Sequence, residues 1–451
     1  MNSKGKKKDG MTRRDFIKVA GTAGVVGALT LAGPGIPFIH AKEKVTLRFL
    51  NSETDADCVK VMAMTSAEYE KKTGVKVLVD TLPAQDAFSK LTASIKGGMP
   101  YDMSCLIFMG DVLLLARDGH LVPVTSLTKK YKFGPRILIP YKNEQYWYPY
   151  DYNLCTMFYR KDLYQQKGLN VAKTWDQLVE NCKALMLDEN KDGVYERHGI
   201  ALPIGTGGPA SYMSFAFLWA EGVKIFDDNF KIIFDSPEMG PKVIKFLDFF
   251  EELYKTMPSG MTQIGFAPPL TLFASEKITH TVFTGKICTH IDKFAPQLAD
   301  KYGMTPYMDS KGVSKAVSFG YDGWVVVKTK YSEESMKFME WFTENHYIDF
   351  LHSSPLGFQP PRMDIYDDPR WRADPMIKKY WWAMQAMWDY LKDPNLIIAS
   401  IDTQGPYVDV RGGKIFNSFA LPEMLQNKLL KKMSSNECLK VAAAKLRKSI
   451  A

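Results

Sequence analysis

Several short stretches of this sequence place aromatic side chains beside acidic ones. Sugars present flat C–H faces and a rim of hydroxyl groups, so the sites that bind them combine stacking rings with hydrogen-bonding side chains. Such stretches are therefore candidates for contact with a polyhydroxylated ligand. Their members are Trp147, Tyr148, Tyr150, Asp151 and Tyr152, then Trp219 with Glu221, and then Tyr321, Asp322 and Trp324.

Each of these candidates has a structural alternative. Trp219 and Trp324 stand among apolar neighbours, which is also typical of tryptophans packed in a core. Asp151 and Asp322 are flanked by aromatic and small residues, a context in which a buried carboxyl often makes a structural hydrogen bond. The sequence leaves both interpretations open.

Further polar candidates follow an expected strand at Val45 to Leu50. Asn51, Glu53 and Asp55 come directly after it, and the carboxyl ends of strands are where open parallel sheets bind ligands. Capping of the next helix is the alternative for Asn51 and Glu53. Arg362, after a Gln-Pro-Pro sequence, is a last ligand-binding candidate, and a structural ion pair is its alternative.

One loop resembles a calcium site. Asp188, Asn190 and Asp192 have the alternating oxygen ligands of such a loop, and Gly193 follows them. Gly199 occupies the twelfth position, where a bidentate Glu is needed, so a solvated turn is the favoured interpretation.

Motifs for covalent or cofactor chemistry are missing from the sequence. The glycine-rich stretch from Gly205 to Ser211 lacks the Lys-Ser or Lys-Thr of a phosphate-binding loop, and we expect a loop at the rim of a cleft. The sequence has no HExxH and no GxSxG motif. Its six cysteines are widely spaced and form no CxxC pair, so we expect buried thiols. We expect no cofactor.

Composition points to a folded, globular chain. The 451 residues are 46% hydrophobic and 24% charged, and this length is enough for two or three domains. The net charge is +8, but residues 1–41 carry seven Lys and Arg against two Asp. The rest of the chain is nearly neutral and has no basic run that could follow a phosphate backbone, so we expect no nucleic-acid partner.

The first 41 residues resemble a twin-arginine signal peptide. Arg13 and Arg14 are followed by Asp15, Phe16, Ile17 and Lys18, and then by a weakly hydrophobic, glycine-containing stretch and a small residue at Ala41. The apolar part, Val19 to Gly33, would span only about 22 Å as a helix, which is short for a membrane anchor. We therefore expect export to the periplasm by the twin-arginine route, with cleavage near Ala41; an uncleaved anchor is the alternative.

The mature chain begins with a pattern of alternating strands and helices. Val45 to Leu50 alternates as a strand does, helical spacing follows, Gly74 ends the helix, and VKVLVD forms a second strand. A further helix leads to a third strand that ends near Phe108. This order predicts an α/β fold with a largely parallel sheet and helices on both faces.

From Tyr148 onward the chain resembles family 1 extracellular solute-binding proteins of ATP-driven importers. The family pattern is an aromatic-Pro strand, a Tyr-x-Lys-Asp-Leu turn, a Gly-Leu pair and a Thr-Trp that opens a helix. Here these are Tyr148-Pro149-Tyr150, Tyr159 to Leu163, Gly168-Leu169 and Thr174-Trp175. Arg160 stands where Asn is commoner. Five later segments, up to a helical tail from about Pro422, also resemble the family in order.

The resemblance implies a two-lobed, type II periplasmic-binding-protein-like fold with a ligand cleft at a hinge between discontinuous lobes. On this basis we expect an N-terminal lobe of residues 42–153 plus 303–352. A C-terminal lobe would comprise residues 154–302 plus 353–451. The resemblance also places the aromatic-acidic stretches at the cleft.

The function implied by the resemblance is that of a binding protein, not an enzyme. Such a protein would capture a mono- or oligosaccharide by lobe closure and deliver it, as a monomer, to membrane permease subunits of an ABC importer. A polyamine or another small solute is the alternative ligand, because acidic side chains suit cations. An exported glycoside hydrolase, with Asp151 paired with Glu221 or Asp322, is the alternative of another class.

Overall fold

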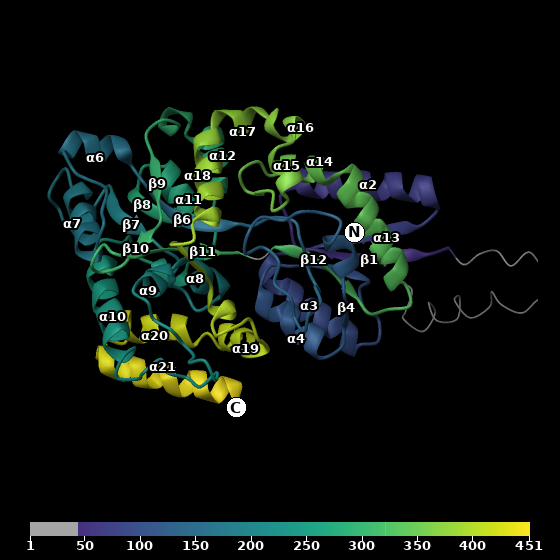
Figure 1. Ribbon diagram of the computed structural model, residues 1–451. Coiled ribbons are helices and arrows are strands. Elements are labelled where there is room, and N and C mark those ends of the chain that lie inside the picture. Colours follow the sequence, from purple (N-terminus) through teal and green to yellow (C-terminus); the bar gives the residue numbers. More distant parts are fainter. Residues whose placement is uncertain (1–43, 321) are drawn as a thin grey trace, which may run out of the picture. The chain divides into compact units, whose positions relative to one another are not determined.

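The computed structural model describes residues 44–320 and 322–451. The expected signal peptide and Tyr321 lie outside these residues. Residues 44–451 form one compact unit that holds two mixed sheets (Figure 1). No helix in the described part of the chain combines the length and apolar character needed to cross a bilayer.

The first sheet has the strand order β2-β1-β3-β12-β4, and β5 also pairs with β12. Strands β1, β2 and β3 run parallel, as the sequence predicts, whereas β12 runs antiparallel to β3, β4 and β5. The strands are β1 (Thr46–Asn51), β2 (Lys76–Thr81), β3 (Met103–Leu106), β4 (Leu121–Val122), β5 (Tyr148–Pro149) and β12 (Gly323–Val327).

The second sheet has the strand order β10-β11-β6-β8-β7, with β13 beside β11 and β9 beside β6. This sheet is mixed: β6 runs antiparallel to β8, β9 and β11, whereas β7 runs parallel to β8 and β13 parallel to β11. The strands are β6 (Leu154–Tyr159), β7 (His198–Ala201), β8 (Ile278–Phe283), β9 (Gly303–Thr305), β10 (Tyr307–Met308), β11 (Lys315–Phe319) and β13 (Ile397–Ala399).

Helices cover both sheets, and Figure 1 shows α2 on one side of the first sheet and α3 and α4 on the other. The helices up to α10 are α2 (Ala56–Thr73), α3 (Ala84–Lys96), α4 (Met109–Arg117), α5 (Thr125–Thr128), α6 (Lys161–Lys167), α7 (Trp175–Leu185), α8 (Gly208–Met213), α9 (Ala216–Ala220) and α10 (Gly240–Tyr254). The later ones are α11 (Pro268–Ala274), α12 (Lys286–Phe294), α13 (Ser332–Asn345), α14 (Tyr347–His352), α15 (Met363–Tyr366), α16 (Pro369–Arg372), α17 (Pro375–Lys379), α18 (Trp381–Lys392), α19 (Val410–Ser418), α20 (Ala420–Leu429) and α21 (Ser435–Ile450). Three 3-10 turns are η1 (Met261–Gln263), η2 (Pro296–Leu298) and η3 (Ile401–Thr403).

Local sequence signals explain several helix ends. Helix α2 ends at Gly74, which adopts φ 77° and donates its backbone N–H to Glu70. Helix α7 begins after Thr174, whose hydroxyl accepts from the backbone N–H of Gln177. Both ends are where the sequence predicts them. All six cysteines lie within the described residues as buried free thiols, which is also as predicted.

The chain passes between the two sheets at neighbouring places. Strand β5 belongs to the first sheet and β6 to the second, so residues 150–153 join them. Strand β11 belongs to the second sheet and β12 to the first, so the chain returns at residues 320–322. Strands β9, β10 and β11 therefore pair with the second sheet, although the expected N-terminal lobe began at residue 303. We propose residues 320–322 as the lobe boundary in place of 303.

Candidate functional site

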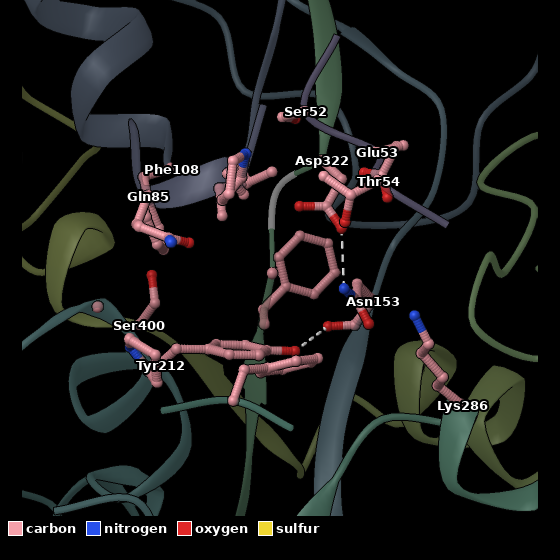
Figure 2. A pocket seen from close by; sticks show the side chains of 18 of the residues that line it. Ser52, Glu53, Thr54, Gln85, Phe108, Asn153, Tyr212, Lys286, Asp322 and Ser400 are labelled. Carbon is pink, nitrogen blue, oxygen red and sulfur yellow. Dashed lines mark hydrogen bonds between the residues drawn. The ribbon is translucent and has the colours of Figure 1, made fainter. Parts of the chain in front are cut away.

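A cavity of about 270 Å³ lies where these connecting segments meet (Figure 2). Its wall combines ring faces, carboxyl groups, amides, hydroxyls and an ammonium group from segments spread over the whole described chain. The polar lining side chains are Ser52, Glu53, Thr54, Asp55, Gln85, Asn153, Tyr212, Lys286, Asp322, Ser400 and Asp402. The apolar and glycine lining is Pro83, Ala84, Ile107, Phe108, Gly208, Pro209, Phe266, Phe319, Gly320 and Phe416.

The two connecting segments meet at Asn153 and Asp322. Asn153 donates its side-chain N–H to a carboxyl oxygen of Asp322 at 2.8 Å, and Gly320 donates its backbone N–H to the carbonyl of Asn153 at 2.9 Å. Tyr212 donates its hydroxyl to the same carbonyl at 2.6 Å (Figure 2). The polar groups at this point of the cavity are thus held by hydrogen bonds between segments far apart in sequence.

The loop after β1 brings Glu53 to the cavity. The side chain of Asn51 is fully buried, donates to the carbonyl of Glu53 at 2.8 Å and accepts the backbone N–H of Glu53 at 3.2 Å. Asn51 therefore shapes the loop and does not cap α2. The hydroxyl of Tyr150, itself buried, donates to the Glu53 carboxyl group.

Three carboxyl groups lie close together here: Glu53 and Asp322 line the cavity, and Asp151 lies behind them. Burial, followed by repulsion from Asp322, raises the pKa of Glu53 to about 7. Burial raises the pKa of Asp322 to about 6, against the lowering effect of its hydrogen bond from Asn153. Asp151 is fully buried, and burial together with repulsion from Asp322 and Glu53 raises its pKa well above its ordinary value. Asp151 lies behind the cavity wall and does not line the cavity.

The ring faces of the cavity are phenylalanines and a tyrosine. Phe108, at the end of the first βαβ region, packs on Phe416 from α19 with ring centroids 4.4 Å apart. Phe266 packs on Phe283 of β8 at the same centroid distance of 4.4 Å. A Cβ at Gly208 would lie 3.0 Å from the Phe108 ring, so the start of α8 approaches this ring closely. The stretch from Gly205 to Ser211 thus reaches the cavity, but as a helix start rather than a loop.

Acidic groups outnumber basic ones in the cavity wall. Lys286, at the start of α12, is the basic side chain among the described lining residues, and its Nζ lies 2.6 Å from a carboxyl oxygen of Asp55. Asp402, on η3, accepts the backbone N–H of Gly110 at 3.0 Å. Burial raises the pKa of Asp402.

Two of the predicted tryptophans lie in the core of the first sheet and not in the wall of the cavity. Trp324 is 3% exposed on β12, stacks on Tyr148 and is covered by Phe342 of α13 and Phe350 of α14. Trp147 is 1% exposed and lies against Gly323, where its indole occupies the space that a Cβ would need. Packing against a central strand, and not stacking on a ligand, explains both side chains.

Trp219 and Glu221 also lie away from the cavity. Trp219 on α9 is 2% exposed and borders a different hollow, between α9 and the segment after β13. Glu221 accepts the backbone N–H and the hydroxyl of Ser310, at 2.8 and 2.9 Å. Glu221 thus joins the end of α9 to the β10–β11 hairpin, and neither residue lines the cavity.

Arg362 is a structural residue. It is 4% exposed, its guanidinium lies 2.5 Å from the Asp364 carboxyl group, and it lies over the Tyr131 ring with its Cζ 3.5 Å from the centroid. It also donates to the carbonyl of Thr343 at 3.2 Å. The ion pair that was the alternative for Arg362 is therefore the arrangement that the structure shows.

The calcium-loop candidate forms a hydrogen-bonded turn. Asn190 accepts the backbone N–H of Asp192 at 3.1 Å, and Asp192 accepts that of Val194 at 2.7 Å. Asp188 accepts the backbone N–H of Gly193 at 3.1 Å. In the described part of the chain, no three His, Cys, Asp or Glu side chains are grouped as a metal site would require.

Sequence reasoning missed most of the cavity wall. Asn153 follows the predicted Asp151 by two residues, and this closeness in sequence is a signal that could indicate its place at the cavity. Lys286, Asp402 and Phe416 stand in segments with no recognisable motif. They reach the cavity only because distant strands pair in the second sheet.

Comparison with known protein sequences identifies the family of this chain. The family model described as "Bacterial extracellular solute-binding protein" matches residues 59–347, and the chain belongs to this family. A maltotriose-binding protein of Pyrococcus abyssi is 26% identical over 70% of this chain and 68% of its own length. A mannitol-binding protein of Pseudomonas aeruginosa is 26% identical over 72% of this chain and 74% of its own length. The family is one of binding proteins.

Solved structures share the fold. An ABC transporter solute-binding protein of Thermotoga lettingae, bound with alpha-D-tagatose, has a TM-score of 0.71 at 21% identity and covers 90% of this chain and 100% of its own. A second such protein, from Agrobacterium radiobacter in complex with ribitol, has a TM-score of 0.72 at 19% identity and covers 90% of this chain and 98% of its own. The chain has the two-lobed type II fold of periplasmic solute-binding proteins.

Proposed function

We propose that this protein captures a small carbohydrate or polyol outside the cytoplasm and delivers it to the permease subunits of an ABC importer. The observation that carries the proposal is the cavity wall, in which ring faces alternate with carboxyl, amide and hydroxyl groups. Rings stack on the C–H faces of a sugar, and the polar groups exchange hydrogen bonds with its hydroxyls. The named ligands of relatives, which include maltotriose and mannitol, support this ligand class.

The size of the cavity limits the size of the ligands that it can hold. Its volume of about 270 Å³ is near the lower end of the roughly 300–1,000 Å³ typical of small-molecule sites. We therefore favour a monosaccharide, a disaccharide or a polyol of similar size over a long oligosaccharide.

Calorimetry and thermal shift with a panel of ligands test this proposal. The panel contains hexoses, pentoses, mannitol, ribitol, maltose and maltotriose, with spermidine and putrescine as cationic members. A saturable melting-temperature rise with at least one compact saccharide or polyol, confirmed by calorimetry, is the expected result. No response to any carbohydrate would contradict the proposal.

A polyamine is the second candidate, because the wall has an excess of acid. Glu53, Asp55, Asp322 and Asp402 line the cavity with one basic side chain, Lys286, and that lysine pairs with Asp55. Carboxylates and ring faces together also suit an ammonium group. A response to spermidine but not to sugars would favour this candidate.

We also propose that the protein binds its ligand without turnover. Asp151 is fully buried outside the cavity wall and Glu221 binds Ser310, so neither presents the free carboxyl group that the glycosidase alternative requires. Incubation with nitrophenyl glycosides and with short oligosaccharides, followed by chromatography, is the test. Release of nitrophenol or of shorter sugars would show an enzyme.

Export by the twin-arginine route is a further part of the proposal. It rests on Arg13 and Arg14 and on the weakly hydrophobic stretch that follows them. Replacement of both arginines by lysine should retain the protein in the cytoplasm, as seen by cell fractionation. A monomer on size-exclusion chromatography is our expectation for the exported protein.

A further inference from the structure

Helices α4 and α19 meet through two glycines, Gly110 and Gly413, close in sequence to the cavity-lining residues Phe108 and Phe416. A Cβ at Gly413 would lie 2.6 Å from both the Cα and the carbonyl oxygen of Gly110, and a Cβ at Gly110 would overlap the Cα of Gly413. Real Cβ contacts are almost never that short, so neither position can carry a side chain unless the helices move apart. We call this contact the glycine seam.

Two hydrogen bonds lie next to the glycine seam. Asp402 accepts the backbone N–H of Gly110 in the first turn of α4 at 3.0 Å, where the helix dipole favours a negative group. Asn417 of α19 donates its side-chain N–H to Asp111 of α4 at 2.9 Å. The bond from Asn417 to Asp111 joins the two helices directly, and Asp402 lies on η3, which packs against both α4 and α19.

The seam joins parts of the chain that belong to different sheets. Helix α4 follows β3 and packs on the first sheet, whereas α19 packs on α21, which in turn packs on α10. Phe108 precedes α4 and Phe416 lies on α19, and both line the cavity together with Asp402. The glycine seam therefore lies next to residues of the cavity wall at both helices, although its two glycines do not line the cavity.

The opposite end of the cavity is held differently. Figure 2 shows Lys286 at the end of the cavity away from Phe108, Gln85 and Ser400. There the ion pair of Lys286 with Asp55 has side chains 35% and 41% exposed, and exposed ion pairs contribute little to stability. The glycine seam, in contrast, is a direct contact between two backbones with no side chain between them.

We propose that the glycine seam is the closing contact of the cleft and that Gly110 and Gly413 are positioning residues for ligand binding. Closure brings the two backbones together, places Asp402 on the first turn of α4 and sets Phe416 against Phe108, which completes the wall around the ligand. The effect on ligand binding rests on the proposed function, whereas the contact between Gly110 and Gly413 does not. It predicts that a single methyl group at the seam holds the cleft partly open.

Gly413→Ala and Gly110→Ala test the proposal, with Gly240→Ala as the matched control. Gly240 begins helix α10, and a Cβ there would meet a methyl group of Leu439 at 3.3 Å and no opposing backbone closer than 3.6 Å. The readouts are hydrogen–deuterium exchange of the α4 amides, the radius of gyration from X-ray scattering with and without ligand, and the dissociation constant of the best saccharide in the panel.

Both seam variants should exchange the first α4 amides about tenfold faster than wild type, because the Gly110 N–H loses Asp402. Their affinity should fall about tenfold or more, and ligand should no longer reduce the radius of gyration. Melting temperatures without ligand should stay within a few degrees of wild type, because opening at the seam relieves the clash. Gly240→Ala should match wild type in all three readouts.

Wild-type exchange, scattering and affinity in both seam variants would overturn the proposal. If the seam variants fail to fold, Asn417→Ala removes the bond to Asp111 without adding atoms; faster exchange in α4 would then support the seam, and unchanged exchange would overturn it. If wild type binds no saccharide, the proposed function fails, while exchange of α4 still decides the seam.

Discussion

Asn153 and Asp322 join the two chain segments that pass between the sheets, through a hydrogen bond of 2.8 Å from the Asn153 amide to the Asp322 carboxyl group. The bond is reinforced next to it by the backbone N–H of Gly320 on the Asn153 carbonyl. Asp322 lines the cavity, and burial raises its pKa because a charged carboxyl group is unfavourable there. The hydrogen bond from Asn153 therefore stabilises a buried carboxyl group at the place where the chain passes between the two sheets.

Asn153→Ala should weaken both folding and ligand binding. The variant leaves Asp322 buried without this donor, which costs about 1–3 kcal/mol of unfolding free energy, and a misplaced carboxyl should lower affinity several-fold. Urea unfolding and calorimetry measure the two effects. Asn345→Ala is the control, because Asn345 donates to the Trp341 carbonyl of its own helix, and it should not change affinity. Equal affinities for wild type and Asn153→Ala would contradict the prediction.

Glu53 should make stability fall as pH rises from about 5 to about 7. Burial raises its pKa to about 7 in the folded protein, above the ordinary 4.5, so in this range the folded state binds more protons than the unfolded state. The free energy of unfolding should therefore decrease with pH, by at most about 1.4 kcal/mol per pH unit for this group.

Urea unfolding at several pH values, on wild type and Glu53→Gln, measures this slope. The glutamine variant should show a flatter decline, because it has no carboxyl group to protonate at this position. Glu333→Gln replaces a carboxylate whose pKa is lowered by Lys337 and should keep the wild-type slope between pH 5 and 7. A Glu53→Gln slope as steep as that of wild type would show that other groups carry the effect.

Tyr212→Ala should reduce saccharide affinity about tenfold or more, whereas Trp219→Phe should leave it unchanged. Tyr212 presents its ring to the cavity and holds the Asn153 carbonyl at 2.6 Å, whereas Trp219 is buried beside a different hollow. Loss of a stacking ring and of its hydrogen bond together accounts for the size of the effect. Calorimetry on both variants decides between the two residues. A large loss in Trp219→Phe would restore that indole as a ligand contact.

Lys286→Met should change unfolding free energy by less than about 1 kcal/mol, because its ion pair with Asp55 is partly exposed. It should also raise the affinity for spermidine relative to sugars, since the wall loses its basic side chain while the acids remain. Lys379→Met, which breaks an exposed pair with Asp292 outside the cavity, is the control. A drop in spermidine binding relative to sugars would contradict the electrostatic argument.

The sequence predicts the local parts of this fold well. The helix end at Gly74, the start of α7 at Thr174 and the parallel β1, β2 and β3 all follow from signals within a few residues. Glu53, Asp55 and Asp322, which stand beside strand ends, line the cavity, and their contact with a ligand stays a prediction.

The positions that local sequence does not decide are those that depend on long-range pairing. The residues around Trp324 in the sequence fit a ligand contact as well as a core position. In the structure, β12 pairs with β3, β4 and β5, and the Trp324 indole packs under α13 and α14. The boundary at residue 303 likewise depends on which sheet β9 to β11 join, and the sequence carries no local signal for that choice.

The sequence by itself determined the elements, their ends, the polar residues after β1 and the family pattern, because these depend on propensities and caps that act within one or two turns of chain. Only the tertiary structure decided that Asn153, Lys286, Asp402 and Phe416 share one cavity and that Gly110 meets Gly413. Most of those contacts join residues more than a hundred positions apart, as Gly110 and Gly413 are, so they depend on how whole sheets and helices pack and not on any local pattern.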